Sequence, residues 1–372
     1  MSMRIVHLTS VHSALDVRIF HKEAKTLARA GHDVTLIAPH DRDEWVGGVR
    51  IVALPRPLNR LDRLFHLVWL LFRRALQQKA RVYHLHDPEL LGVGLLLKVA
   101  GRQVIFDAHE NLPKQILSKQ WIAPILRRPL AVVVGLIEKA FVLSYDRVVV
   151  ATEDIAKRFR GKHPIVIHNY PILEMMHPRN VAHATDDECV LVYVGVISRT
   201  RGAVEMVRAL QRLPHRMRVR LDLIGRFEPG DLEDELKALE GYERVRFLGW
   251  HSMPQVYRQI ADADIGLLCL HPEPNHITAL PTKLFEYMAA AIPVIASNFP
   301  LWIEIIERNQ CGKVVDPLDP ADEADAIASL MENPELGREM GKNGRRAVLE
   351  KYNWGREAEN LLQVYRDLPE DM

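Results

Sequence analysis

The stretch Pro281-Thr-Lys-Leu-Phe-Glu-Tyr-Met-Ala-Ala-Ala-Ile-Pro-Val-Ile-Ala296 decides how this chain folds. Its first half has the spacing of an amphipathic helix, and the apolar run that Pro293 opens predicts a buried parallel strand. Lys283 and Glu286 are three residues apart, so they share one face of that helix. A cation and a carboxylate there suit a ligand with a phosphate end and a hydroxyl end, such as a nucleotide-sugar. An ordinary surface ion pair is the simpler alternative, and the rest of the chain has to distinguish the two.

The bulk properties predict a two-domain globular protein. A chain of 372 residues is too long for one ordinary core, and 48% hydrophobic with 26% charged residues is typical of a soluble protein. The longest apolar stretch is too short to span a bilayer. Three widely separated cysteines predict a reducing compartment, and a first strand that begins at Arg4 leaves no room for a signal peptide. We therefore expect a cytoplasmic protein.

The charges are distributed unevenly along the chain. Up to Tyr170 there are 26 Lys and Arg against 15 Asp and Glu, whereas the remainder has 23 against 33. Two basic segments, 56–81 and 114–128, also carry large apolar and aromatic residues, which indicates contact with an anionic membrane surface and a peripheral location at its inner face. Packed helices with a solvated basic face are the alternative. Nucleic acid is not an expected partner, because the aromatic residues do not alternate with basic ones.

Strand and helix patterns alternate throughout, which predicts the α/β class with two Rossmann-like parallel-sheet domains and a ligand cleft between them. The N-terminal domain is expected at 1–170, a linker at 171–187 and the C-terminal domain at 188–352. The expected strands of the first series are 4–8, 33–38, 49–53, 81–84, 103–107, 147–151 and 165–167; those of the second are 190–194, 218–224, 245–248, 264–268, 292–296 and 313–315.

The end of the first strand in the second series predicts an anion site. Gly195 is followed by Val-Ile-Ser-Arg-Thr-Arg-Gly202 and then by a helix. Such a turn presents free N–H groups and the positive end of a helix dipole. Arg199 and Arg201 add charge that suits phosphate oxygens. Arg226 follows Gly225 at the end of the next strand, where it could serve similarly.

In the first half, polar residues follow three expected strands. His109 and Glu110 come directly after the strand that ends with Asp107, and His109 could hydrogen-bond a sugar or act as a general base. His86 and Asp87 follow an earlier strand, although Asp87 before Pro88 is also a natural helix N-cap. The loop 10–18, which contains Asp16 and Arg18, likewise follows the end of an expected strand.

No metal or cofactor site is expected. His84-x-His86 would lie on one face of a strand and could bind a metal, but third and fourth ligands do not recur at metal-site spacing. The D-x-D patterns at 41–43 and 262–264 favour a structural use.

Together these residues resemble the retaining glycosyltransferases of family 4, which have the GT-B fold, over nearly the whole chain. The most specific piece is Pro281-x-Lys283-Leu-Phe-Glu286-Tyr-Met-Ala-x-x-x-Pro293-Val-Ile, which is close to the family's donor-binding signature. The resemblance implies that Glu286 binds the ribose hydroxyls of a nucleoside diphosphate sugar. It also implies that a C-terminal helix within 353–372 crosses back onto the first domain.

The resemblance assigns further roles. Arg201 and Lys283 would hold the diphosphate, Gly195 would open the phosphate loop, and His109 would contact the donor sugar near the reacting carbon. We accordingly expect His109, Arg201 and Lys283 to be catalytic. The side chains expected on the acceptor side are Asp16, Arg18, His86, Asp87 and Glu110.

Two departures from the family pattern stand out. The family has two glutamates eight residues apart, and Thr278 occupies the place of the first. Its role would pass to backbone N–H groups around Ile277 to Leu280. The donor-binding candidates are Gly195, Arg199, Arg226, Thr278, Leu280 and Glu286. The usual Gly-Gly loop after the first strand is replaced by the segment 11–18.

The expected activity is transfer of a sugar, with retention of configuration and without a metal, from a UDP- or GDP-linked donor to a glycan or lipid-linked acceptor. Bacterial cell-surface polysaccharide or glycolipid synthesis is the expected setting. The chemistry would rest on stabilising the departing diphosphate. Two alternatives are a GT-B nucleotide-sugar epimerase, which needs no acceptor, and a non-catalytic nucleotide-sugar-binding protein.

Overall fold

The computed structural model describes residues 2–119, 122–179 and 188–369, and these form two compact units. Unit 1 contains the residues up to Asn169 together with those from Trp354 onward. Unit 2 runs from Tyr170 to Asn353. Each unit has its own sheet and its own hydrophobic core, so each is described separately below.

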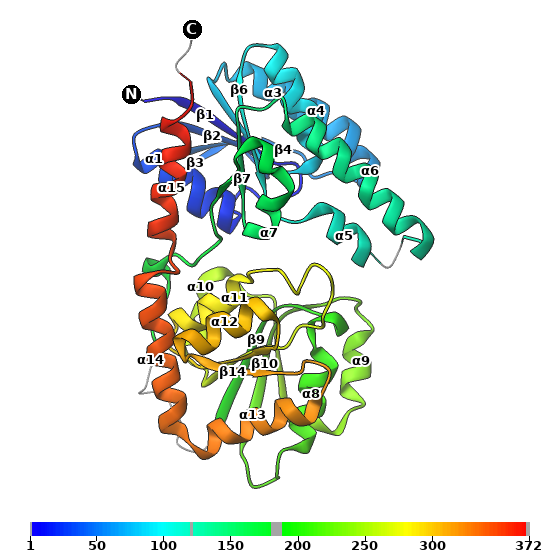
Figure 1. The fold of residues 1–372 in the computed structure, drawn as a ribbon, viewed down its shortest axis with the longest axis vertical. Coiled ribbons are helices and arrows are strands. Elements are labelled where there is room, and N and C mark those ends of the chain that lie inside the picture. Colours follow the sequence, from blue (N-terminus) through cyan, green and yellow to red (C-terminus); the bar gives the residue numbers. More distant parts are fainter. Residues whose placement is uncertain (1, 120–121, 180–187, 370–372) are drawn as a thin grey trace. The chain divides into compact units, whose positions relative to one another are not determined.

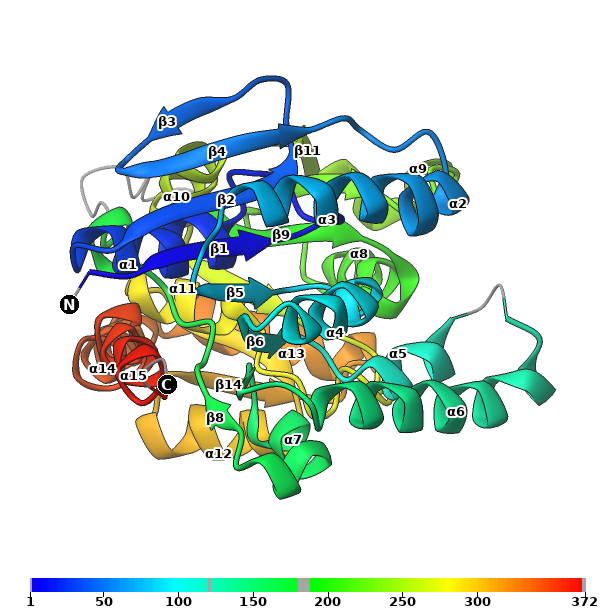
Figure 2. The same cartoon turned by 90° about the horizontal axis from the view of Figure 1, so that it is seen from above.

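Unit 1 is an eight-stranded sheet with the order β3-β4-β2-β1-β5-β6-β7-β8, parallel except for β3, which pairs antiparallel with β4 (Figures 1 and 2). Its elements are β1 (Arg4–Leu8), η1 (Val17–Ala24), α1 (Lys25–Arg29), β2 (Asp33–Pro39), β3 (Glu44–Val46), β4 (Val49–Leu54), α2 (Arg60–Asp62), η2 (Arg63–Leu67), α3 (Val68–Gln77), β5 (Val82–Leu85), η3 (Pro88–Leu90), α4 (Leu91–Val99), β6 (Gln103–Ala108), α5 (Leu112–Ser118), α6 (Pro124–Val142), β7 (Arg147–Val150), α7 (Glu153–Ala156), η4 (Lys157–Lys162), β8 (Ile165–Val166) and α15 (Trp354–Arg366).

Unit 2 is a six-stranded parallel sheet with the order β11-β10-β9-β12-β13-β14. Its elements are η5 (Leu173–Met175), β9 (Cys189–Ile197), η7 (Arg199–Arg201), α8 (Ala203–Arg212), β10 (Val219–Phe227), α9 (Leu232–Lys237), η8 (Glu240–Arg244), β11 (Val245–Gly249), α10 (Met253–Ala261), β12 (Ile265–Leu268), α11 (Thr282–Ala289), β13 (Val294–Ser297), α12 (Pro300–Asn309), β14 (Gly312–Val315), α13 (Pro320–Glu332) and α14 (Pro334–Glu350).

Both sheets have the doubly wound order, in which the strand order reverses beside the first strand. The reversal lies between β1 and β5 in unit 1 and between β9 and β12 in unit 2. Ligands bind open α/β sheets outside the carboxyl ends of the strands at this point, because the connections leave it in opposite directions. The fold therefore directs attention to the loops after β1, β5, β9 and β12.

The two faces of the unit 1 sheet differ in polarity. Val6 and Leu8 of β1 face an apolar core that also contains Tyr83 and Leu85 of β5. Side chains alternate along a strand, so His7 lies on the opposite face. Helix α15 belongs to this unit, where the Trp354 indole N–H donates to Thr26 Oγ1 at 3.0 Å. Figure 1 shows α15 alongside α1.

The expected α/β class with two parallel-sheet domains is confirmed, and every strand expected from the sequence is present within a few residues of its predicted bounds. The short antiparallel strand β3 was not expected, because three residues carry too little periodicity to be recognised. Among the described residues, none of the helices combines the length and apolar character needed to cross a bilayer.

The first part of the segment 171–187, which the sequence analysis expects to be a linker, belongs to unit 2. Tyr170 and Met176 are buried in the core of unit 2, and the Tyr170 ring lies 4.7 Å from the Phe285 ring, centre to centre. The proline-rich composition indicated a linker, but packing of these side chains fixes the segment to unit 2. Residues 180–187 lie outside the described part of the chain.

Candidate functional site

At the switch point of unit 2, two glycines allow the backbones of β9 and β10 to lie unusually close together. Gly195 and Gly225 are neighbours in the β9–β10 register, with φ angles of 143° and 150°. A Cβ on Gly225 would lie 1.8 Å from the Gly195 carbonyl oxygen, so only glycine fits there. The strand ends are consequently lined by peptide groups rather than by side chains.

The turn that follows β9 reaches the end of β12. Gly202, at φ 77°, is the N-cap of α8, and a Cβ there would lie 2.1 Å from the Cys269 carbonyl oxygen. The His271 N–H donates to Thr200 O at 2.9 Å, which joins the two loops. The N-terminus of α8 thus lies at the switch point, where its free N–H groups suit an anion.

The three arginines expected near this loop differ in their surroundings. Arg201 lies against the loop itself, since a Cβ on Gly195 would be 3.4 Å from its Nη1. Arg199 is more than half exposed and forms an ion pair with Glu235 of α9. Arg226 is exposed at the end of β10. The structure thus places only Arg201 directly against Gly195.

Helix α11 carries the Lys283–Glu286 pair. Lys283 Nζ lies 2.5 Å from Glu286 Oε2, and the Tyr257 hydroxyl donates to Glu286 Oε1 at 3.4 Å. Glu286 is only 3% exposed, so this is not an ordinary surface ion pair. The Tyr287 hydroxyl accepts a hydrogen bond from the Val194 N–H at 3.2 Å, which ties the helix to the end of β9.

The segment around Thr278 forms a turn before α11. The N–H groups of Ile277 and Ala279 donate to Glu273 O and His276 O, both at 3.1 Å. These two backbone groups are therefore occupied, contrary to the expectation that they replace the missing glutamate. Leu280 packs against the hydrophobic core. Thr278 itself lies within the turn.

Two histidines beside this turn were missed from the sequence. His271 Nε2 lies 3.0 Å from a carboxylate oxygen of Glu205, in the first turn of α8. Burial and the nearby Arg201 charge lower the pKa of His276, although its ring nitrogen bonds His271 O. Their position three and eight residues after the end of β12 was the available signal, since that loop lies at the switch point.

In unit 1, the equivalent strand ends contain buried charge. Arg18 Nε and Nη2 donate to the two carboxylate oxygens of Asp107 at 3.0 and 2.9 Å. Burial would raise the pKa of Asp107, but Arg18 and His109 outweigh it and hold that pKa well below its usual range. Arg18, expected on the acceptor side, is only 4% exposed and lies inside the unit.

His109 stands in front of this pair. Its Nε2 lies 2.9 Å from Asp107 Oδ2 and 3.2 Å from His86 Nδ1. The side chain remains 15% exposed, whereas His86 is buried. Asp107 therefore orients the imidazole of His109 from behind. Among Asp107, His86 and His109, only His109 reaches the surface.

His12 is a candidate that the sequence analysis did not single out. Its ring centre lies 5.6 Å from that of His109, and its two nitrogens lie 3.5 Å from Asp16 and 3.6 Å from Asp87. Burial lowers its pKa, but the Asp16 hydrogen bond and the Asp87 charge outweigh burial, and the pKa is raised. The only sequence signal was its place in the loop after the first strand.

The remaining acceptor-side candidates shape this loop. Asp87 accepts hydrogen bonds from the Ser10 and Val11 N–H groups at 2.6 and 3.2 Å, rather than capping η3 with its side chain. Asp16 caps η1 by accepting from the Arg18 and Ile19 N–H groups. Glu110 is exposed beside His109.

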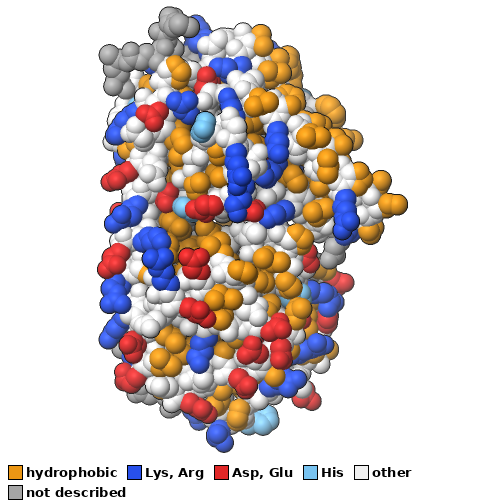
Figure 3. All heavy atoms as spheres, in the orientation of Figure 1, with side chains coloured by type: hydrophobic (Ala, Val, Ile, Leu, Met, Phe, Trp, Pro, Cys, Tyr) orange, Lys and Arg blue, Asp and Glu red, His pale blue; other side chains and the backbone are white. Residues whose placement is uncertain are grey.

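Helix α6 has an unusual distribution of apolar residues. Its buried positions are Ala131, Gly135, Glu138 and Val142. Its exposed positions carry the larger apolar side chains: Ile125, Leu126, Val132, Val133, Leu136 and Ile137 are each at least 47% exposed. Figure 3 shows hydrophobic side chains gathered over the region of α4 and α6.

A groove of about 460 Å³ between α5 and α6 is lined by Leu117, Val132 and Leu136 with Arg128, Lys139 and Arg158.

The basic residues of segments 56–81 and 114–128 are partly engaged within the unit. Arg63 pairs with Glu89, Lys114 with Asp154, and Arg56 with Asp41. The apolar surface of α6 is thus a stronger feature than the basic charge that the sequence emphasised.

The fold is shared with solved GT-B enzymes. The sucrose-phosphate synthase from Thermosynechococcus elongatus superposes with a TM-score of 0.81 at 22% identity over 98% of each chain. Anabaena Alr3699/HepE in complex with UDP-glucose superposes with a TM-score of 0.74 at 15% identity, over 98% of this chain and 100% of that one.

The sequence matches two family models. Residues 17–169 match Glycosyltransferase Family 4, and residues 178–347 match Glycosyl transferases group 1. The chain belongs to the group 1 glycosyltransferases. It is 25% identical over 369 residues to the phosphatidyl-myo-inositol mannosyltransferase of Mycobacterium leprae (strain TN), covering 92% of this chain and 90% of that protein. The chain spans about half the length of the first curated relatives that it matches, 48% and 47%.

Proposed function

We propose that this protein transfers a sugar, with retention of configuration, from a UDP- or GDP-linked donor to a glycan or lipid-linked acceptor in cell-surface polysaccharide or glycolipid synthesis. The observation that carries the proposal is the half-buried Lys283–Glu286 pair, fixed through Tyr287 to the end of β9. A nucleoside diphosphate has hydroxyls for a carboxylate and phosphates for a cation. The UDP-glucose bound by the solved Anabaena neighbour supports this donor class.

Unit 2 would supply the donor site. Glu286 would accept hydrogen bonds from the ribose hydroxyls, while Lys283, Arg201 and the N-terminus of α8 would face the diphosphate. These groups stabilise negative charge without a metal, because lysine, arginine and backbone N–H groups are already positive or dipolar. Their charge matters most when the sugar–phosphate bond breaks and the diphosphate gains a full negative charge.

Unit 1 would supply the acceptor side. His109, held by Asp107, would hydrogen-bond the donor sugar near the reacting carbon, and Asp16, His12 and Glu110 would contact the acceptor. No second carboxylate is required as nucleophile when the departing phosphate oxygen takes the proton of the acceptor hydroxyl. The new bond then forms on the face that the diphosphate leaves, which retains the configuration.

The first test is a donor screen followed by kinetics. Lys283→Ala and Glu286→Ala should each lower kcat/KM with the preferred donor about 100-fold to 1,000-fold, because each removes charge-stabilising or donor-binding contacts. Arg338→Ala is the matched control, since Arg338 and Glu335 form an exposed i,i+3 pair in the same unit. Equal effects of Arg338→Ala and Lys283→Ala would overturn the site assignment.

Separate arms distinguish the other activities. Sugar inversion of the donor in the absence of an acceptor would indicate an epimerase instead. Donor binding without turnover on any lipid or glycan acceptor would indicate a binding protein. The anomeric configuration of the product, read by NMR, tests retention directly.

We further propose that α6 docks on an anionic membrane that carries the acceptor. The support is its large apolar exposed face beside Arg128 and Lys139, because such faces bind the headgroup boundary. Val132→Glu with Leu136→Glu should reduce sedimentation with phosphatidylglycerol-containing vesicles at least tenfold. Leu349→Glu, at an exposed position of α14, is the control. Unchanged sedimentation of the double variant would remove this surface from consideration.

A further inference from the structure

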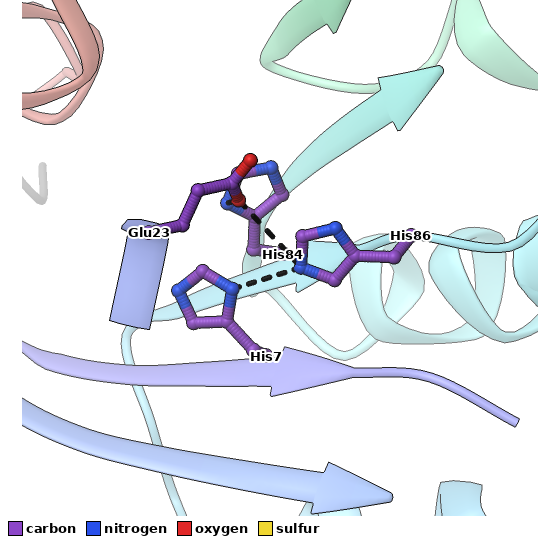
Figure 4. A group of neighbouring side chains, drawn as sticks. All are labelled: His7, Glu23, His84 and His86. Atoms are coloured by element: carbon purple, nitrogen blue, oxygen red, sulfur yellow. Dashed lines mark hydrogen bonds and ion pairs between the residues drawn. The ribbon is translucent and has the colours of Figure 1, made fainter. Parts of the chain in front are cut away.

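Four side chains of types that commonly bind metal ions lie close together inside unit 1. His7 comes from β1, His84 and His86 from β5 and the residue after it, and Glu23 from η1 (Figure 4). β1 and β5 are neighbours and His7 is paired with His84 in register. We refer to these four residues as the buried cluster. Residue exposure is 0% for His7, Glu23 and His84 and 2% for His86.

The geometry is close to that of a four-coordinate metal centre. One nitrogen or oxygen atom from each residue lies within 4.8 Å of those of the other three. His7 Nδ1 lies 2.8 Å from His86 Nε2, while Glu23 Oε2 lies 3.9 Å from His86 Nε2 and 4.0 Å from His84 Nδ1. Tetrahedral Zn²⁺ bonds of about 2.0 to 2.1 Å separate their ligand atoms by roughly 3.3 Å. The observed separations bracket that value. His84 Nδ1 also lies 2.7 Å from the Tyr365 hydroxyl, so it would exchange that hydrogen bond for the ion.

The chemistry of the cluster also calls for a cation. Glu23 and Asp107 are two buried carboxylates that share one guanidinium, that of Arg18. Glu23 Oε1 lies 3.0 Å from Arg18 Nε, the same nitrogen that donates to Asp107 Oδ2. A buried carboxylate in this position must keep a proton or gain a second positive partner. A divalent ion would provide that partner.

The His86 ring also has polar neighbours outside the cluster. Its Nδ1 lies 3.2 Å from His109 Nε2 and 3.6 Å from Asp107 Oδ2. A carboxylate thus stands near the second nitrogen of this imidazole, and a carboxylate in such a place commonly helps to orient a metal-bound histidine.

We propose that His7, Glu23, His84 and His86 bind one zinc ion in a closed structural site. Imidazole nitrogens and carboxylate oxygens are both ligands that Zn²⁺ takes, and four protein ligands at a fully buried position leave no place for a catalytic water. The ion would join β1, β5 and η1 and would fix His86 with its Nδ1–H toward Asp107 and His109. His84-x-His86 alone gave no such site; the other two ligands come from distant sequence positions.

The test uses the full chain produced in zinc-supplemented medium without a polyhistidine tag, because a buried ion is best incorporated during folding. Elemental analysis should give about one Zn²⁺ per chain in the wild type and in His66→Gln, which changes an exposed histidine of the same unit. His7→Gln and Glu23→Gln should each retain less than about one tenth of that. Protein refolded with Co²⁺ should show the visible absorption of a tetrahedral site, and His7→Gln should not.

A second measurement keeps the proposal testable when a variant does not fold. Wild-type protein refolded with zinc should melt about 5 to 10 °C higher than protein refolded with a chelator, for zinc at a hundredfold excess over its Kd. A folded wild type that contains no zinc, and whose Tm is the same with zinc and with chelator, would overturn the proposal. The four residues would then be a buried polar cluster that holds no metal.

Discussion

The two units have the same strand order around the switch point, but they are built differently there. In unit 1, the ends of β1, β5 and β6 are occupied by ionisable side chains such as Arg18, Asp107 and His109. In unit 2, Gly195 and Gly225 bring the backbones of β9 and β10 together two residues before the strands end, and the charged groups stand near helix starts.

The same fold can therefore serve two tasks. Backbone N–H groups bind an anion at any pH and require only close approach, which glycine permits. Buried side chains hold charge or protons at chosen positions, but each needs a partner in the low-dielectric interior. Unit 2 therefore suits recognition of a diphosphate, and unit 1 suits orientation of a histidine.

The sharpest test of the side-chain design is Asp107→Asn. It should lower the stability of unit 1 by about 3 to 5 kcal/mol, because it removes the charge of one partner in a buried ion pair. Glu23 would then be the remaining carboxylate beside Arg18. Asp33→Asn is the control: Arg4 and Asp33 are also 2.9 Å apart but about half exposed, so the loss should stay below about 1 kcal/mol. Hydrogen exchange of β6 amides measures both. Equal losses would show that burial does not set the difference.

The corresponding test of the backbone design is Gly202→Ala. It should destabilise unit 2 by about 2 to 4 kcal/mol and abolish donor binding, because the new Cβ would collide with Cys269 O as well as occupy a left-handed conformation. Gly249→Ala has nearly the same φ, 71°, with nothing within 4 Å, and should cost about 1 kcal/mol. Exchange of β12 amides and donor-induced thermal shifts provide the measurements. If the donor raised the Tm of Gly202→Ala as much as that of the wild type, the close approach of Gly202 to the Cys269 carbonyl would not matter for donor binding.

Unit 2 also contains a buried carboxyl group without the pairing seen in unit 1. Burial raises the pKa of Glu323 in α13 to about 8, although the neighbouring Cys269 thiol acts to lower it. The folded protein keeps this proton up to about pH 8, whereas the unfolded chain loses it near pH 4.5. Wild-type stability therefore falls as the pH rises between these values.

Glu323→Gln should remove that loss. Its stability relative to wild type should rise from about zero near pH 4.5 to about 4 kcal/mol at pH 8, measured by urea denaturation across that range. Glu332→Gln, at the exposed end of the same helix, should show no such dependence. A pH-independent difference would mean that Glu323 has an ordinary pKa in the folded protein.

Much of the fold follows from local pattern. Short apolar runs rich in β-branched residues, such as Val190 to Val194, alternate with helical patterns and so indicate buried parallel strands, which made both sheets predictable. The edge strand β3 and the packing of Tyr170 into unit 2 were not, because a three-residue strand has no periodicity and aromatic packing depends on distant partners.

The candidate sites were likewise predictable from the sequence only in part. The sequence by itself determined the two α/β sheets, the glycine turn after β9 and the adjacency of Lys283 and Glu286, because these depend on residues close together in the chain. Only the tertiary structure decided that Glu286 is buried, that Arg18 faces inward onto Asp107, and that His7 and Glu23 join His84 and His86. The physical reason is that burial and charge pairing arise from residues far apart in sequence, which local spacing does not bring together.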